Sequence, residues 1–518
     1  MVPVKVTGMA RIVVIGAGLG AMATAARLAV AGHRVTVYER GGTHGGAVGR
    51  FERDGFAFDT GPGLLHLPAV YRDLFVKTGR ESLEDSVDLA PVDPASRHLF
   101  ADGTDVSLPN ASRGAVAALS DTLGAEQAER WDAFMGRAGD AWDRVRRPLL
   151  EEPLWPNWQV LGKDPYPSVP TRRLLRERRA STLAEVGAWE LRDPRLVALL
   201  ESYALAFGLD PRRAPASAAV LPYMEQTFGT WYVRGGMRAL ADAVYARCLA
   251  RRVEFVFGAE VVAVTARDGR VGGVELADGT EVEADHVVAA VHPAVVNGLV
   301  HGRPDGPWEG HELYAEGDFQ PDLEVSGAGR VTVCLALSGA RDPQAAHRTV
   351  VHSSDRTAEL RTVFEDAGAP KSPTVWVMRP DDPALRPDDA HETVVLTAAA
   401  PSLDLDDWTP SLGSAWADAM VAQASRAVPG LADRILWREV RTPRDIAAQT
   451  GAPDGNLPAP ALAGASGRWL MRSNSPRLPG LYAAGGWAHP GGGLAHAGMS
   501  GALVAGLIVE GDDFRGSQ

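Results

Sequence analysis

The alternation of apolar and polar residues is clearest at the start of the chain. Residues 12–15 form a continuous apolar run, which is typical of a strand buried on both faces. Residues 19–31 are rich in alanine and compatible with a helix, and Gly32 stands where a C-terminal helix cap belongs. Residues 35–38 resume a strand-like pattern. The chain is therefore predicted to begin with a strand, a tight turn, a helix and a second strand.

Two later blocks of the chain have equally regular patterns. In the first block, residues 238–250 predict a helix, and Asp-Gly pairs at 268–269 and 278–279 supply hairpin turns between short β-like runs. In the second block, a strand is predicted at 481–484 and a helix at 497–509. The β-like runs of the first block cover residues 253–257, 260–264, 271–276 and 286–290.

The regular blocks are separated by two long stretches of mixed character. We expect the regular blocks to form one nucleotide-binding domain from residues 1–77, 226–300 and 468–518. The stretches between them, 78–225 and 301–467, are expected to build a second domain. A ligand would then lie at the domain interface, where enclosed pockets usually form.

Composition and charge exclude several classes of function. Of the 518 residues, 45% are hydrophobic and 23% are charged, which is ordinary globular composition. The 52 basic and 65 acidic residues give a net charge of −13, which argues against nucleic acid as the main partner. The two cysteines offer no disulfide framework and no cysteine metal site. No run reaches the roughly 18 apolar residues that cross a bilayer, and no signal-peptide core precedes the first strand, so we expect a cytoplasmic protein with peripheral membrane contact at most.

A glycine-rich turn, GAGLGA at residues 16–21, directly follows the first predicted strand. Gly16 permits the tight turn, Gly18 lets the backbone approach a pyrophosphate, and Ala21 allows close packing of helix on strand. The helix N-terminus then supplies free amides and partial positive charge for phosphates. Glu39, at the end of the second strand, stands where an acid receives the ribose hydroxyls of an adenosine. Strand, turn, helix and acid together predict a dinucleotide site.

The segment after the second strand favours FAD over NAD. It contains Gly45 and Gly46, followed by Asp59, Gly61 and Pro62. This glycine-punctuated loop could fold over a longer and more extended cofactor, whereas an ordinary surface loop is the alternative. The sequence has no second strand–GxGxxG–helix unit, so electrons are expected to leave a flavin for oxygen, a quinone or another diffusible acceptor.

Four further motifs follow the N-terminal fingerprint in order: LFADGTDVSLP (99–109), FGTWYVRGGMRALADAV (228–244), GAEVVAVTARDGRVGGVELADG (258–279) and SPRLPGLYAAGGWAHPGGGLAHAGMSGALVAGLI (475–508). With these motifs the chain resembles the phytoene desaturase-like flavoproteins, the carotenoid desaturase branch of the amine oxidase superfamily. The resemblance covers nearly the whole chain. It implies an α/β fold, with a discontinuous Rossmann-type FAD-binding domain and an inserted mixed α+β substrate-binding domain.

FAD is the cofactor that the resemblance implies. The segment HPGGGLAH, residues 489–496, would pass beside the isoalloxazine ring and open the last helix toward it. A reduced flavin is negatively charged near N1 and O2, and a helix N-terminus with close glycine backbone stabilises that charge. A proline-glycine loop that caps a core helix is the alternative. The expected FAD contacts are Gly16, Gly18, Leu19, Gly20, Glu39, Arg40, Gly45, Gly46, Val261, Gly485, Gly492, Gly493 and Leu494.

The chain departs from the family pattern at several positions. Family members usually carry arginine after the double glycine, where this chain has Ala47, so a phosphate or flavin contact is missing unless Arg50 supplies it. Trp487 stands where smaller residues are common, so the flavin rim or substrate mouth is expected to differ. The wider amine oxidase group often has an acid at the position of Gly486, and its absence favours the desaturase branch.

Catalytic residues are less well defined by the sequence. Hydride removal from an allylic carbon needs geometry and a dry pocket more than a strong base. His489 is the candidate to position substrate or take a proton, with a structural histidine as the alternative. Trp231, Tyr232 and Trp487 are candidate substrate-lining residues, with ordinary core packing as the alternative. Motifs for a metal site or a serine hydrolase are absent from the sequence.

The leading hypothesis is an FAD-dependent desaturase or dehydrogenase that works by hydride transfer to flavin N5, and the resemblance alone implies that its substrate is an extended apolar polyene or isoprenoid. An amine oxidase or a double-bond isomerase or reductase on the same scaffold is the alternative among enzymes. A cage of aromatic residues would favour amines, and a long apolar tunnel would favour polyenes. A lipid-binding carrier of the same fold is the alternative that is not an enzyme, and the glycine-rich C-terminal segment argues against it.

Overall fold

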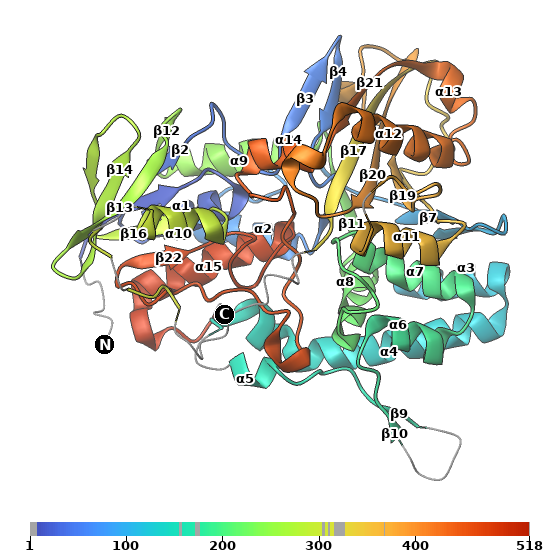
Figure 1. Ribbon diagram of the computed structural model, residues 1–518, viewed down its shortest axis with the longest axis horizontal. Helices are drawn as coiled ribbons and strands as arrows, with labels where there is room; N and C mark the ends of the chain where they lie inside the picture. Colours follow the sequence, from blue (N-terminus) through green and yellow to red (C-terminus); the bar gives the residue numbers. More distant parts are fainter. Residues whose placement is uncertain are drawn as a thin grey trace.

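A computed structural model describes residues 8–154, 158–170, 177–302, 306–308, 311–314, 327–366 and 368–516. In Figure 1 a parallel sheet and its helices lie on one side, a larger sheet lies at the upper opposite side, and a layer of helices lies beneath the larger sheet. Among these described residues, no helix is long and apolar enough to cross a membrane.

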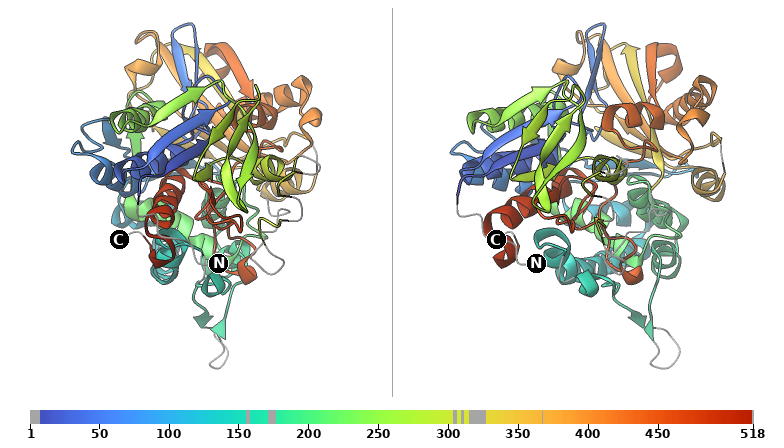
Figure 2. Two further views of the ribbon diagram at one scale, coloured as in Figure 1. Left: turned by 90° about the vertical axis from the view of Figure 1, so that its left-hand side faces the viewer. Right: turned by 60° about the vertical axis from the view of Figure 1, so that its left-hand side comes forward.

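The first sheet is parallel and five-stranded, in the order β12-β2-β1-β16-β22. Ile12 and Val14 of its central strand pack on helices, whereas Val13 and Ile15 pack on a second, three-stranded sheet, so both faces are buried as predicted. Figure 2 shows these two sheets side by side, in blue and green. The strands are β1 (Arg11–Ile15), β2 (Arg34–Glu39), β12 (Glu254–Phe257), β16 (His286–Ala289) and β22 (Leu481–Ala483), and the second sheet contains β13 (Val261–Arg267), β14 (Arg270–Leu276) and β15 (Glu281–Glu283).

The helices around the first sheet match the sequence prediction closely. α1 (Leu19–Val30) and α9 (Met237–Ala250) cover one face together with α15 (Leu494–Glu510), and α10 (Pro293–His301) lies on the other face. α15 begins at Leu494, earlier than the predicted residue 497, because Gly493 acts as its N-cap. α2 (Ala69–Thr78) packs against α1 and α15.

The larger sheet has seven strands, in the order β21-β17-β20-β19-β18-β7-β8. Val331, Val333 and Leu335 of its strand β17 pack on Trp416 and Met420 of α12, so the opposite face of the sheet is turned toward the interior of the molecule. The strands are β7 (Ser96–Leu99), β8 (Asp105–Leu108), β17 (Gly329–Ser338), β18 (Arg348–Val351), β19 (Val375–Met378), β20 (His391–Ala400) and β21 (Ile435–Arg441), with α11 (Arg356–Phe364), α12 (Pro410–Ala424), α13 (Leu431–Arg434) and α14 (Pro443–Thr450) beside them.

A helical layer completes the second half of the molecule (Figure 1). Trp131, Phe134 and Leu199 are among its fully buried side chains. A hairpin of β9 (Val169–Pro170) and β10 (Glu177–Arg178) projects from the body of the molecule (Figures 1 and 2). The helices of the layer are α3 (Ser112–Leu123), α4 (Ala125–Arg146), α5 (Trp158–Leu161), α6 (Leu183–Val186), α7 (Pro194–Leu205) and α8 (Val220–Phe228).

Smaller strands link the two halves. The hairpin β3 (Arg50–Arg53) and β4 (Phe56–Asp59) places Phe56 and Phe58 against Cys334 of the seven-stranded sheet. A three-stranded sheet joins β5 (Leu65–His66), β11 (Thr230–Val233) and β6 (Leu89–Pro91). The strands of the two large sheets fall within the chain segments expected for the two domains, although the exact boundaries stay a prediction.

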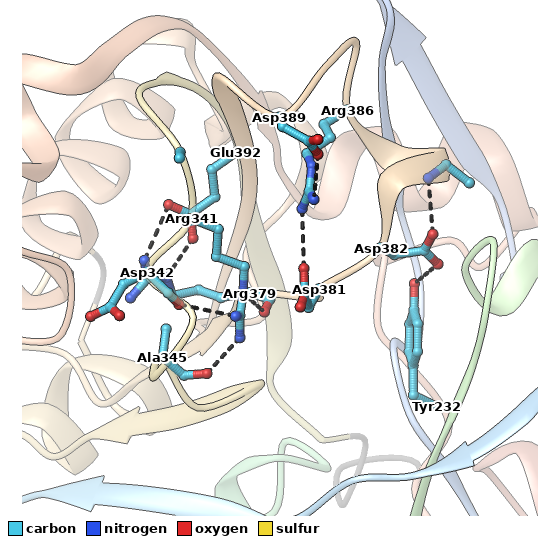
Figure 3. Close-up of polar contacts among 12 residues, drawn as sticks. Tyr232, Arg341, Asp342, Ala345, Arg379, Asp381, Asp382, Arg386, Asp389 and Glu392 are labelled. Carbon is cyan, nitrogen blue, oxygen red and sulfur yellow. Dashed lines mark hydrogen bonds and ion pairs between the residues drawn. The ribbon is translucent and has the colours of Figure 1, made fainter.

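A polar contact also joins the halves, as Figure 3 shows. The Tyr232 hydroxyl donates a 2.7 Å hydrogen bond to Asp382, which also accepts the Gly235 amide at 2.6 Å. The loop that carries Asp382 follows Arg379, whose guanidinium pairs at 2.7 Å with the buried Glu392 carboxylate. This ion pair helps to fix the loop that contacts Tyr232 and Gly235 of the other half.

Candidate functional site

One large cavity, with a volume of about 1420 Å³, lies where the two halves meet. Its walls come from the β1–α1 turn, the end of β2, the glycine loop at 41–49, the start of β13, the first turn of α15 and one face of the seven-stranded sheet. These segments come from the N-terminal, middle and C-terminal parts of the chain. The fold therefore assembles the site that the sequence predicted in pieces.

The start of α1 forms one end of this cavity. Gly18 is the N-cap of α1 and has no side-chain capping bond, so the first amides of the helix remain available to a ligand. The amide of Gly45 donates a 2.8 Å hydrogen bond to the Ala17 carbonyl, which fastens the glycine loop to the turn. A Cβ atom on Gly46 would lie 3.0 Å from the Gly18 Cα. Glycine is needed here because the loop touches the turn at backbone distance.

Glu39 organises the same turn. Its two carboxylate oxygens accept the Ala17 amide at 2.8 Å and the Gly41 amide at 2.7 Å. Each carboxylate oxygen has a second lone pair, so the group can still accept hydroxyl donors. Both Glu39 and Val261, which are expected FAD contacts, line the cavity.

The start of α15 forms the ring end of the cavity. Gly493 is the N-cap of α15, again without a side-chain bond, and it lines the cavity with Gly485 and Leu494. Gly492 does not line the cavity; a Cβ on Gly492 would lie 1.7 Å from the Pro458 carbonyl oxygen, so its role is close backbone packing. All the other expected FAD contacts line the cavity.

The segment at the start of α1 and the C-terminal glycine segment contact each other directly. A Cβ on Gly20 would lie 2.6 Å from the Gly485 Cα, and one on Gly501 would lie 2.8 Å from the Thr24 amide nitrogen. Small residues on α1 and α15 therefore let the phosphate end and the ring end of the site share one packed interface.

The structure does not bring every predicted residue to the cavity. The His489 ring is fully buried elsewhere, where Nε2 lies 3.0 Å from the Glu152 carbonyl oxygen, because the loop turns the ring away from the cavity. His496 of α15 lines the cavity instead, and burial lowers its pKa to about 4, which keeps it neutral at neutral pH. Trp231 also lies off the cavity, under the Arg72 guanidinium, whereas Tyr232 and Trp487 line it.

Sequence reasoning missed a support for the glycine loop. Gln449 of α14 donates a 2.9 Å hydrogen bond from Nε2 to the Gly46 carbonyl, and Arg441 holds the Gln449 side chain at 2.8 Å. All three line the cavity next to Ala47, where the family arginine is missing. Arg50 lines the cavity as well, but its guanidinium bonds Gly235 O at 3.2 Å and pairs with Glu52. The capping box of Thr442 and Asp445 that starts α14 was the available signal for this helix.

A buried polar cluster lies at the far side of the cavity. Arg348 of β18 makes a double hydrogen bond with Glu225 of α8, and His66 lies 3.5 Å from the same carboxylate. Although burial raises the pKa of Glu225, Arg348 holds it below the usual value, so the pair is ionised. This cluster was also missed, since its members come from three distant segments.

The residues around the cavity fit FAD. Two helix starts, those of α1 and α15, open into one cavity without side-chain caps and without acidic residues in their first turns. Their free amides suit a pyrophosphate at one end and an electron-rich ring at the other. The volume exceeds the roughly 300–1,000 Å³ of ordinary ligand pockets, which leaves room for a dinucleotide and a substrate. Bound there, FAD would supply two-electron redox chemistry.

Several curated proteins are similar to this chain over almost its whole length. The chain is 29% identical to 4,4'-diapolycopene oxygenase of Methylomonas sp, over 96% of this chain and 98% of that protein. It is 28% identical to hydroxyneurosporene desaturase of Rubrivivax gelatinosus, over 96% and 93% of the two chains. It is 27% identical to phytoene desaturase (neurosporene-forming) of Rhodobacter capsulatus, over 97% and 94%.

Solved structures share the fold. An oxidoreductase from Methanosarcina mazei superposes with a TM-score of 0.62 at 16% identity, over 95% of this chain and 99% of that one. Putrescine oxidase, wild type bound to putrescine, gives a TM-score of 0.62 at 13% identity, over 97% and 99%. The family model described as flavin containing amine oxidoreductase matches residues 21–323, more than half of the chain. The protein therefore belongs to this family and is an FAD-dependent oxidoreductase.

Proposed function

We propose that this enzyme dehydrogenates an extended apolar polyene of isoprenoid type. The chain's own residues would hold the polyene against bound FAD and exclude water, and FAD would supply the two-electron acceptor for the hydride while the second hydrogen leaves as a proton. The observation that carries the proposal is the cavity-facing side of the seven-stranded sheet. Val350, Trp376, Met378 and Val395 lie there on three adjacent strands and form an apolar strip.

The names of the relatives support the same substrate class. Each of these three curated relatives is named for a carotenoid-type substrate. The named reactions include both oxygenation and desaturation. The relatives therefore support a polyene as the substrate class more strongly than they support one particular position of oxidation.

Anaerobic single-turnover reduction tests this proposal. We expect phytoene or neurosporene in vesicles to bleach the flavin absorbance of the purified holoenzyme and to yield a polyene that absorbs at longer wavelength. Reduction of the flavin by putrescine, with no reduction by any polyene, would overturn the proposal in favour of an amine oxidase.

The electron acceptor and the site of action complete the proposal. We propose that oxygen or a quinone reoxidises the flavin, and that the enzyme meets its substrate at a membrane surface, because long polyenes partition into lipid. Stopped-flow reoxidation with each acceptor tests the first point. Co-flotation with vesicles tests the second, and a protein that stays entirely at the bottom of the gradient would contradict it.

A further inference from the structure

The sheet wall of the cavity carries two half-buried arginines, of which one has a carboxylate partner and the other has none among the described residues. Arg348 is neutralised by the Glu225 carboxylate, which raises its pKa although burial lowers it. Arg330 of β17 also lines the cavity, but no carboxylate of the described residues lies within ion-pair distance of it. Its pKa is lowered by burial to about 10, so the guanidinium still carries its charge at neutral pH. A partly desolvated cation without a counter-ion is stabilised when a ligand supplies the negative charge.

The hydrogen bonds of Arg330 leave it available to a ligand. Its Nη2 donates to the carbonyl oxygen of Ala206, directly after α7. A guanidinium has five N–H donors, so most of its hydrogen-bonding capacity remains unused by the described residues. The planar donor fork matches a carboxylate, which accepts two parallel hydrogen bonds.

Arg330 lies at the ring end of the cavity. Phe207, which follows the Ala206 acceptor, has a ring atom 3.8 Å from the position of a Cβ on Gly493. On the other side of Arg330, a Cβ on Gly329 would lie 3.5 Å from the Asn456 side-chain oxygen. The residue after the Arg330 acceptor thus packs against the start of α15, where the flavin ring is expected, which places Arg330 on this side of the cavity.

Two hydroxyl groups extend the same polar patch. Thr332 lies two positions along β17 on the face of Arg330, and Thr397 of β20 is its register partner. Both line the cavity. Next to this patch, the same face continues as the apolar strip of Val350, Trp376, Met378 and Val395. One wall thus offers a cationic, hydroxyl-lined end and an apolar continuation.

We propose that Arg330, with Thr332 and Thr397, binds a carboxylate at one end of the substrate, so that the enzyme prefers a polyene acid to the corresponding hydrocarbon. This inference rests on the proposed function and deepens it. The apolar strip binds the chain of conjugated double bonds, and the polar patch fixes which end lies by the ring. Arg330 is then a specificity-determining residue.

Binding of matched acid and ester tests the proposal. The probes are norbixin, a linear polyene diacid, and its dimethyl ester, titrated into the oxidised holoenzyme with the flavin spectrum and tryptophan fluorescence as readouts. We expect the wild-type enzyme to bind the acid at least tenfold more tightly than the ester. Arg330→Gln should bring the acid to the affinity of the ester and leave the ester within about twofold, and Arg330→Lys should retain part of the preference. Arg361→Gln removes an exposed positive charge of α11 and should change neither affinity.

Several outcomes would overturn the inference. Equal wild-type affinity for acid and ester does so without any variant, which covers the case of an Arg330→Gln protein that does not fold. Equal loss of both affinities in a folded variant also does so. Arg330→Gln could instead keep the acid preference and lower the flavin midpoint potential by about 30 mV or more, which is a tenfold change in the equilibrium constant of a two-electron couple. The guanidinium would then interact with the flavin and not with the substrate. Flavin reduction by neurosporene with no acid preference would refute this inference alone, whereas no response to any polyene would refute the proposed function.

Discussion

Replacing Gly20 with alanine probes the contact between α1 and the C-terminal segment around Gly485. The added methyl group would lie 2.6 Å from the Gly485 Cα and 3.0 Å from the Ala497 carbonyl oxygen. Favourable carbon–carbon contacts are about 3.5–4.0 Å, so backbone must move by about 1 Å. Overpacking of this kind costs roughly 1–3 kcal/mol, and the better helix propensity of alanine returns up to about 1 kcal/mol.

The matched control is Gly136→Ala, in the exposed middle of α4, where an added Cβ meets no atom within 4 Å. This control should gain about 0.5–1 kcal/mol of unfolding free energy, because only the propensity changes. Gly20→Ala should be less stable than the control by about 1–3 kcal/mol.

FAD affinity provides the second readout of this pair. The apoprotein can relieve the clash by moving the Gly485 segment, whereas FAD needs both segments in place. We therefore expect Gly20→Ala to bind FAD about tenfold more weakly for each 1.4 kcal/mol of strain. Chemical denaturation and fluorescence titration with FAD measure the two effects. If Gly20→Ala has the same unfolding free energy and the same FAD affinity as Gly136→Ala, the segments around Gly20 and Gly485 do not form the shared interface described here.

Three further predictions address other parts of the site. Glu39→Gln should weaken FAD binding by about 1.5–3 kcal/mol, the usual range for hydrogen bonds to a charged group, as measured by titration of the apoprotein; unchanged affinity would remove Glu39 from the ribose site. Burial raises the pKa of Asp59 from 3.8 to about 6, so its ionisation should cost about 3 kcal/mol of folding stability as pH rises from 4 through 6. Asp59→Asn should lack this loss, and identical pH profiles of unfolding free energy would contradict it. Tyr232→Phe should destabilise the protein by about 1–3 kcal/mol, since Asp382 loses a donor; a difference below measurement error in urea unfolding would show that this link between the halves is unimportant.

The sequence predicted the nucleotide-binding half well because its signals are local. The apolar run before Gly16 and the alanine-rich helix after it specify one βαβ turn, and the structure reproduces both within a residue or two. The meeting of this turn with Gly485 followed from the resemblance and is present as a backbone contact. Close packing of this kind requires glycine, so the glycines in the sequence already indicated that backbone segments approach each other at these positions.

The substrate half was predicted poorly because its signals are distributed over distant segments. Arg330 and Glu225 both line the cavity because of the strand order and the helix packing. Neither residue lies in a motif of regular spacing. The direction of the His489 ring depends on the path of its loop, which composition does not specify. The sequence singled out the segment 489–496, and in the structure His496 of this segment lines the cavity whereas His489 does not.

The position of FAD in a crystal structure of the holoprotein tests the central claim most directly. We expect pyrophosphate oxygens at hydrogen-bond distance from the first amides of α1, with the isoalloxazine ring in contact with the Gly493 backbone at the start of α15. Phosphates bound away from α1, or a ring that does not touch the α15 N-terminus, would contradict the claim.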